Sequence, residues 1–99
     1  MFRQDYYEFV LPVGGDAVPV LNANTDTFAF AEFDISGEVW RLSDDRRGGI
    51  KIRNGQTYIM TGADFAVAGR GQEITVYMKN AGAEPAVVRV VKSYRSGDV

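Results

Sequence analysis

Short apolar runs recur about every eight to twelve residues along the chain, and glycine, asparagine, aspartate and proline separate them. Few segments carry apolar residues at the spacing of an amphipathic helix. The pattern predicts strands at residues 6–11, 17–21, 27–33, 38–42, 49–53, 56–61, 64–67, 73–79 and 86–94. We therefore expect an all-β, single-domain β-sandwich, immunoglobulin-like or jelly-roll-like, of about eight mostly antiparallel strands.

The dipeptide Asn54-Gly55 is the strongest local signal, because it easily adopts the two positive φ angles of a type I′ turn. It predicts a tight hairpin between the strands 49–53 and 56–61. One face of this hairpin would carry Ile50, Ile52 and Ile59. The opposite face would carry Tyr58 and Met60 beside Lys51 and Arg53, which makes it a candidate interaction surface.

Two other strands depart from simple alternation. Residues 86–91 carry valines on both faces, which predicts either a central strand or an outer surface covered by a partner chain. Between Phe30 and Phe33 the large apolar residues change parity, and a bulge near Ala31 and Glu32 would place both rings on one face.

The 99 residues suffice for one domain, 1–99, in which residues 1–5 lack a strand pattern and are interpreted as an N-terminal arm. A net charge of -2 and scattered Lys and Arg residues argue against nucleic acid as a partner. Neither a membrane-spanning apolar run nor a signal peptide is recognised, so we expect a soluble protein and no membrane partner.

The chain has no His and no Cys, which removes the usual general base, thiolate chemistry and most transition-metal ligands. The serines and the acidic pair Asp44-Asp45 lack an orienting partner, so we expect no enzyme, no catalytic residue and no cofactor. Residues 22–26 place Asn22, Asn24 and Asp26 at alternate positions, as a calcium loop does. Thr27 replaces the expected glycine, so an Asx-rich turn is favoured over a metal site.

The N-terminal segment, residues 1–9, is rich in the aromatic and arginine residues that dominate protein interfaces; a first strand packed on its own core is the equal alternative. Two further positions are candidates: the predicted hairpin face and the turn at residues 69–71, which presents an arginine. The charged loop at residues 43–49 is interpreted as a solvated connection, with a polar contact at the rim of an interface as the alternative. The interface candidates are Phe2, Arg3, Tyr6, Tyr7, Phe9, Tyr58, Met60 and Arg70.

Residues 73–90, with Lys79-Asn80-Ala81-Gly82, then Pro85 and a valine-rich run, resemble the closing hairpin of immunoglobulin-like sandwiches. In overall character, a short all-β chain without His or Cys and with an aromatic N-terminal segment, the protein resembles the small decoration or cement proteins of tailed bacteriophage capsids. That resemblance implies a virion structural protein, assembled in the host cytoplasm, that forms a homo-oligomer and binds a capsid or other virion protein.

The alternative is an immunoglobulin-like ligand-binding module. It would recognise a carbohydrate or a protein surface through Trp40, Tyr58 and loop residues.

Overall fold

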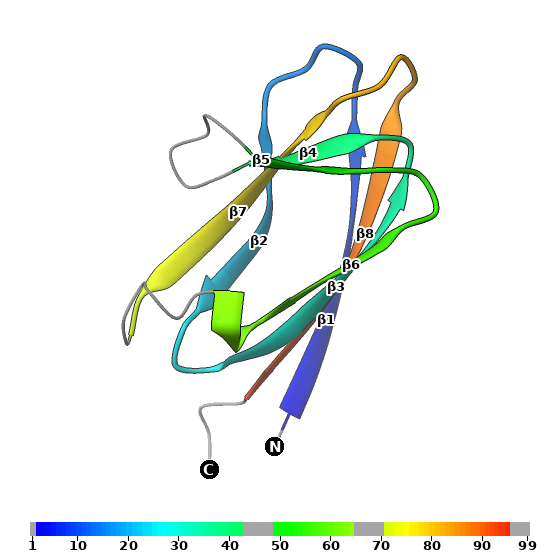
Figure 1. Ribbon diagram of the computed structural model, residues 1–99. Helices are drawn as coiled ribbons and strands as arrows, with labels where there is room; N and C mark the ends of the chain where they lie inside the picture. Colours follow the sequence, from blue (N-terminus) through cyan, green and yellow to red (C-terminus); the bar gives the residue numbers. More distant parts are fainter. Residues whose placement is uncertain (1, 43–48, 65–70, 96–99) are drawn as a thin grey trace.

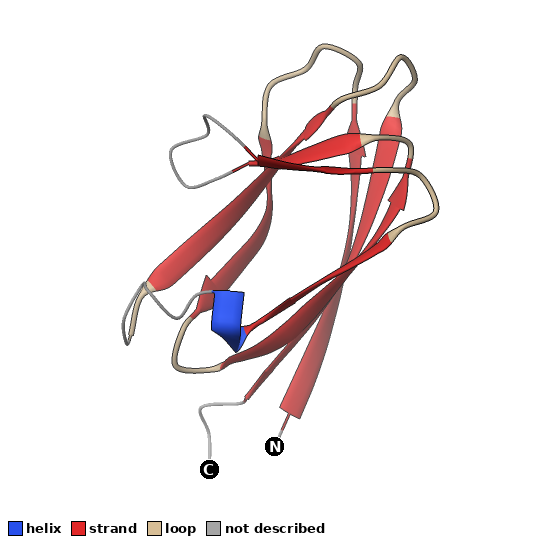
Figure 2. Cartoon of the chain, viewed as in Figure 1, coloured by secondary structure: helices blue, strands red, loops and turns tan. Residues whose placement is uncertain are grey.

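The computed structural model describes residues 2–42, 49–64 and 71–95 of the chain. The strands are β1 (Phe2–Leu11), β2 (Val18–Asn24), β3 (Phe28–Ser36), β4 (Val39–Leu42), β5 (Gly49–Ile52), β6 (Thr57–Thr61), β7 (Glu73–Asn80) and β8 (Ala86–Arg95). They form two antiparallel sheets, ordered β1-β8-β3-β6 and β2-β7-β4-β5, which pack face to face (Figure 1). The predicted all-β sandwich is confirmed, and Figure 2 shows strands in both layers.

The strand pairing is nested. The first strand pairs with the last, β2 with β7, β3 with β6 and β4 with β5. This is the connectivity of a jelly roll, in which the chain crosses between the sheets at each connection except β4–β5. Because β7 and β8 belong to different sheets, residues 73–90 do not form an immunoglobulin-like closing hairpin, and that prediction is wrong.

The predicted Asn54-Gly55 hairpin is also wrong. A tight turn is present, since the backbone N–H of Gln56 donates to the carbonyl of Arg53 over 3.1 Å and Gly55 has φ 85°. However, β5 pairs with β4 and β6 pairs with β3. An Asn-Gly turn determines where the chain reverses and leaves open which strand becomes the partner. Here the reversal connects the two sheets.

The core fills the space between the sheets. Its largest fully buried side chains are Phe33, Leu11, Met60, Met78, Val20, Val39, Val88 and Val90. Each such burial contributes roughly 1.5–3 kcal/mol relative to exposure. β8 lies between β1 and β3, so its predicted central position is confirmed, with Val88 and Val90 inward and Val87 and Val91 outward and half-buried.

The predicted bulge near Ala31 and Glu32 is wrong, because β3 pairs regularly with β6 and β8 through these residues, and Phe30 and Phe33 point to opposite faces; an irregularity lies earlier in the strand. The register against β8 shifts between Phe28 and Phe30, so Ala29 is the extra residue. As a result Phe28 and Phe33 both reach the core, whereas Phe30 points outward and is 37% exposed.

Residues 2–5 are not an arm. They are the first part of β1, which pairs with β8 from Phe2, opposite Arg95, to Leu11, opposite Ala86, without a register break. The predicted strand 64–67 is not seen at Asp64, which belongs to a short 3₁₀ turn over residues 62–64, and its remaining residues lie outside the described ranges. Within those ranges, no helix is long and apolar enough to cross a membrane.

The sandwich end formed by the connections 12–17, 37–38, 53–56 and 81–85, here called the Asn80 end, is held by internal hydrogen bonds. Asn80 is buried, and its Nδ2 donates to the backbone carbonyls of Leu11 (2.9 Å) and Glu84 (2.7 Å). Its Oδ1 accepts the N–H of Gly82 (2.7 Å). One side chain therefore ties the end of β1 to the β7–β8 connection.

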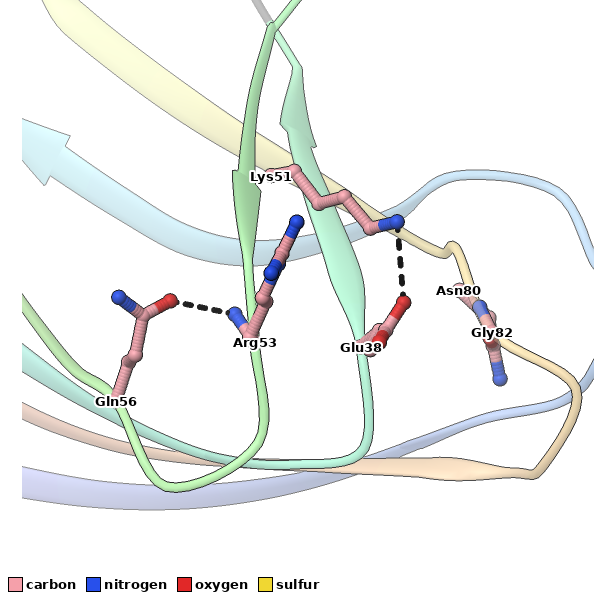
Figure 3. A network of polar contacts seen from close by, with 6 residues as sticks. All are labelled: Glu38, Lys51, Arg53, Gln56, Asn80 and Gly82. Carbon is pink, nitrogen blue, oxygen red and sulfur yellow. Dashed lines mark hydrogen bonds and ion pairs between the residues drawn. The ribbon is translucent and has the colours of Figure 1, made fainter.

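Two exposed polar contacts border this end (Figure 3). Lys51 Nζ lies 3.1 Å from Glu38 Oε2, and Gln56 Oε1 accepts the backbone N–H of Arg53 over 2.7 Å. Such exposed pairs contribute little to stability.

Candidate functional site

The outward face of the β1-β8-β3-β6 sheet, here called the outer face, exposes several large apolar side chains. Their exposed fractions are Phe2 66%, Tyr6 72%, Val10 62%, Phe30 37% and Ile59 56%. Monomeric proteins rarely leave contiguous apolar surface of this kind in water unless it binds something. The outer face is therefore the main candidate for an interaction site.

The strand register places these side chains in rows. Tyr6 lies opposite Val91, Val91 opposite Glu32, and Glu32 opposite Ile59, so these residues form one row across the four strands. Val10 lies opposite Val87 in a second row. Opposed residues of an antiparallel sheet point to the same side and contact each other. Tyr6 and Val91 are thus neighbours, as are Val10 and Val87, whereas Glu32 separates Ile59 from Val91.

A polar row separates the two apolar rows. Arg89 Nε donates to Glu8 Oε2 over 3.3 Å, and the Thr57 hydroxyl donates to Asp34 Oδ1, also over 3.3 Å. Both members of the Glu8–Arg89 pair are well exposed, so the pair adds little stability. A protein that covers this row meets a carboxylate, Glu8, that is already paired with a guanidinium, and the carboxylate of Glu32 in the neighbouring row would need a polar group of the partner.

The residues proposed from the sequence divide among several places. Phe2 and Tyr6 lie on the outer face, whereas Arg3, Tyr7 and Phe9 alternate with them and lie on the opposite side of β1. Phe9 is half-buried and packs against the core. Arg70 and the loop residues 43–48 lie outside the described ranges.

The predicted Tyr58–Met60 surface does not exist. Met60 is fully buried, and Tyr58 is half-buried with its ring centroid 5.9 Å from that of Phe33. Burial is the main cause that raises the pKa of Tyr58; Arg41 lowers this pKa and Asp64 raises it further. The exposed residues of β6 are Thr57, Ile59 and Thr61, because the even-numbered side chains, Tyr58 and Met60, point inward.

Sequence reasoning missed five residues of the outer face: Val10, Phe30, Ile59, Val87 and Val91. The signal for Val10 was available, since Phe2, Tyr6 and Val10 share one parity in an uninterrupted strand. Ile59 was assigned to the core through the wrong hairpin.

A second feature is a groove of about 460 Å³ at the opposite end from Asn80, where β1 begins and β8 ends. Three aromatic side chains line it, Tyr7, Phe9 and Tyr94, together with Lys92 and residues of β2. The Tyr7 and Phe9 rings stack at 6.3 Å between centroids. The groove therefore combines aromatic walls with polar groups.

Lysine 92 joins the two sheets beside this groove. Its Nζ donates to the backbone carbonyl of Asn22 over 2.6 Å and lies 5.1 Å from the centre of the Tyr94 ring. The Tyr7 hydroxyl donates to Asp5 Oδ2 over 3.3 Å. The pKa of Tyr7 is raised, first by burial and then by the Asp5 carboxylate. At the rim, Asn24 Nδ2 donates to Glu73 Oε1 over 3.0 Å.

The Asx-rich turn is confirmed. Asn24 Oδ1 accepts the N–H of Asp26 over 2.9 Å, and Asp26 Oδ1 accepts the N–H of Gly71 over 3.0 Å. Across the described ranges, no group of three or more carboxylate, His or Cys side chains is placed to hold a metal ion.

Trp40 lies on the outward side of the other sheet and is 39% exposed. Its cross-strand neighbours are Lys51 and Lys79, and Lys51 Nζ lies 5.8 Å from the ring centre. Tyr58 points inward from the first sheet, so Trp40 and Tyr58 do not form one ligand site. That part of the alternative interpretation is wrong.

Comparison of the chain with models of known protein families, with curated proteins and with solved structures gives no match.

Proposed function

We propose that this protein is a non-enzymatic structural protein of a virus particle, a phage capsid decoration protein that binds the assembled lattice through its outer face. The observation that carries the proposal is the set of exposed apolar side chains Phe2, Tyr6, Val10 and Ile59 on one face of a well-packed sandwich. Interfaces gain most of their binding energy from such apolar and aromatic anchors.

The architecture supports this role without proving it. Eight-stranded jelly rolls occur in viral capsid domains, although lectins and cupins share the architecture, so the fold alone does not decide the function. The outer face supplies the specific argument. Its apolar rows provide binding energy, and its Glu8–Arg89 pair remains satisfied when covered.

Stabilisation of the lattice follows from mass action. A protein that binds assembled capsid subunits and has little affinity for dissociated ones shifts the equilibrium toward the assembled state. Burial contributes about 25 cal/mol per Å² of apolar surface removed from water.

The test is co-sedimentation of the purified protein with capsids assembled from the major capsid protein of the same virus. We expect the wild type to co-sediment, and the double variant Tyr6→Ser/Val10→Ser to bind at least tenfold more weakly. The matched control is Trp40→Ser, which removes a partly exposed aromatic ring from the other sheet and should bind like the wild type. A wild type that stays in the supernatant at every concentration contradicts the proposal.

The groove favours a second candidate function, a carbohydrate-binding module. Sugar sites combine an aromatic platform with fixed polar groups, and the groove brings Tyr7, Phe9 and Tyr94 near Lys92 and Asn24. On this alternative a glycan array gives a signal that Tyr7→Ala removes and Trp40→Ala leaves unchanged. An array without signal for the wild-type protein excludes it.

A further inference from the structure

The four edge strands of the sandwich differ in how they are protected. Edge strands expose unpaired backbone groups, and proteins usually protect them by shortness, by lysine or proline, or by bulges. β2 carries Pro19 and a register break next to it. β5 has four residues, including Gly49 and Lys51, and β6 has five residues.

The fourth edge, β1, carries the charged residues Arg3, Asp5 and Glu8, but it is neither shortened, bulged nor interrupted by proline. It has ten residues, contains no Pro, Gly or Lys, and pairs with β8 without a register break. It also presents the exposed aromatic side chain of Tyr6, at 72%. A long and regular edge strand with exposed aromatic side chains is suited to pair with another strand.

We propose that β1 pairs antiparallel with β1 of a second copy of this chain, about a two-fold axis that passes at Tyr6. This inference rests on the proposed function, and it identifies a second copy of the chain as a partner of the β1-β8-β3-β6 sheet. The pairing joins the two β1-β8-β3-β6 sheets into one continuous sheet, with the outer faces of both copies on the same side.

The register follows from symmetry and charge. To keep inward side chains inward in both copies, the two-fold axis must pass through a residue position of β1. An axis at Arg3, Asp5 or Glu8 places a charged residue opposite its own copy, which is unfavourable. An axis near either end of the strand pairs only a few residues.

The two central registers that remain differ in how they match apolar residues. An axis at Tyr7 places Tyr6 opposite Glu8 and Val10 opposite Gln4 on the outer face. An axis at Tyr6 pairs residues 2–10 of each copy and places Tyr6 opposite Tyr6 and Phe2 opposite Val10. Gln4 then faces Glu8. Of these two registers, only the one centred at Tyr6 pairs apolar residues with apolar residues, and polar residues with polar residues, on the outer face.

This dimer also extends the proposed capsid-binding surface. The outer face of the new strand pair then carries three apolar pairs, one of Tyr6 with Tyr6 at the two-fold axis and two of Phe2 with Val10, which alternate with two pairs of Gln4 with Glu8. A two-fold decoration unit would bind equivalent sites on two neighbouring capsid subunits.

The chain contains no cysteine, so a single introduced cysteine reports the register directly. In the Tyr6 register the Cβ atoms of two facing residues lie about 4.5–5.5 Å apart, close enough for a disulfide after a small adjustment. We expect Tyr6→Cys to form a covalent dimer under mild oxidation. In Gln4→Cys the two cysteines lie four positions apart, about 13 Å at 3.3 Å per residue, and should not form a disulfide.

A second experiment mixes two cysteine variants, both of which retain the Tyr6 side chain. Gln4→Cys mixed with Glu8→Cys should give a heterodimeric disulfide, whereas either variant alone should not. Ile59→Cys, exposed on the edge strand β6, measures cross-linking by random collision. The proposal is supported if covalent dimer forms at least tenfold faster with Tyr6→Cys and with the mixture than with Ile59→Cys.

The inference is overturned if Tyr6→Cys and the mixture cross-link no faster than Ile59→Cys. These experiments use the purified protein alone, so they separate the two proposals. Capsid co-sedimentation without register-specific cross-linking removes the dimer and leaves the decoration role. Cross-linking without co-sedimentation supports the dimer and removes that role.

Discussion

The two ends of the sandwich use their polar groups differently. At the Asn80 end, a buried side chain binds Leu11, Glu84 and Gly82, and the backbone N–H of Ala81 donates to the Glu38 carbonyl over 2.8 Å. At the opposite end an aromatic groove lies beside Lys92, whose Nζ donates to the Asn22 carbonyl of the other sheet. The comparison indicates that the Asn80 end contributes mainly to stability, while the groove end and the outer face retain surface available for binding.

The largest expected effect tests whether the Asn80 end carries this stability. Asn80→Ala leaves two buried or partly buried carbonyls and one N–H without their partner, and we expect it to lower the free energy of unfolding by about 3 kcal/mol. Urea unfolding followed by circular dichroism measures the change. Asn24→Ala, at the groove end, is the matched control and should cost about 1 kcal/mol. Equal losses at both sites would contradict the comparison.

A second substitution tests the close packing at the Asn80 end. Gly37 has φ 101°, and a Cβ built there would lie 3.0 Å from the Cβ of Ala86. Gly37→Ala should therefore cost about 2 kcal/mol from strain and crowding together. Gly55 also has a positive φ, 85°, but a Cβ there meets no atom within 4 Å. Thermal unfolding should thus show a smaller loss for Gly55→Ala, about 1 kcal/mol.

A third substitution addresses the groove end. Lys92→Met keeps most of the aliphatic side chain but removes the hydrogen bond to the Asn22 carbonyl, with an expected cost of about 1 kcal/mol. Urea unfolding measures the stability. A loss as large as that of Asn80→Ala would show that both ends contribute equally to the fold.

The smallest effect is a pH dependence at Tyr58, which lies between the two ends in the inward row of β6. Its pKa is raised above 10 in the folded state, mainly by burial. The neutral phenol is thus favoured by folding, and this stabilisation is fully present below pH 10 and is lost as pH rises through the raised pKa. Tyr58→Phe should lose less stability than the wild type as the pH rises through the raised pKa of Tyr58, which pH-dependent urea unfolding measures. Identical pH profiles for the two proteins would contradict the shift.

Much of the fold could be predicted from local pattern. Alternation in Glu73–Asn80 and the doubly apolar β8 gave strands whose bounds differ from the observed ones by one residue at most. The partner of each strand could not be predicted in the same way. The Asn54-Gly55 turn fits a hairpin within one sheet and a crossing between two sheets equally well, because the turn geometry is local and the choice of sheet depends on distant strands.

The candidate site, too, could be predicted only where it depends on local sequence. Phe2 and Tyr6 were identified by residue type, and their exposure agrees with that choice. Met60 was misplaced because its orientation depended on the wrong pairing. The groove was not predicted, since it forms where β1, β2 and β8 meet, and these strands are far apart in the sequence.

The nested pairing also determines the order in which the chain can fold. β1 pairs only with β8 in its sheet, so its hydrogen-bonded partner is synthesised last of all the strands. Contacts between such distant segments close large loops, and folds dominated by them fold slowly. During synthesis the ten residues of β1, with their aromatic side chains, must therefore remain unpaired. The strand proposed to join two finished copies is also the one most exposed to premature association between nascent chains.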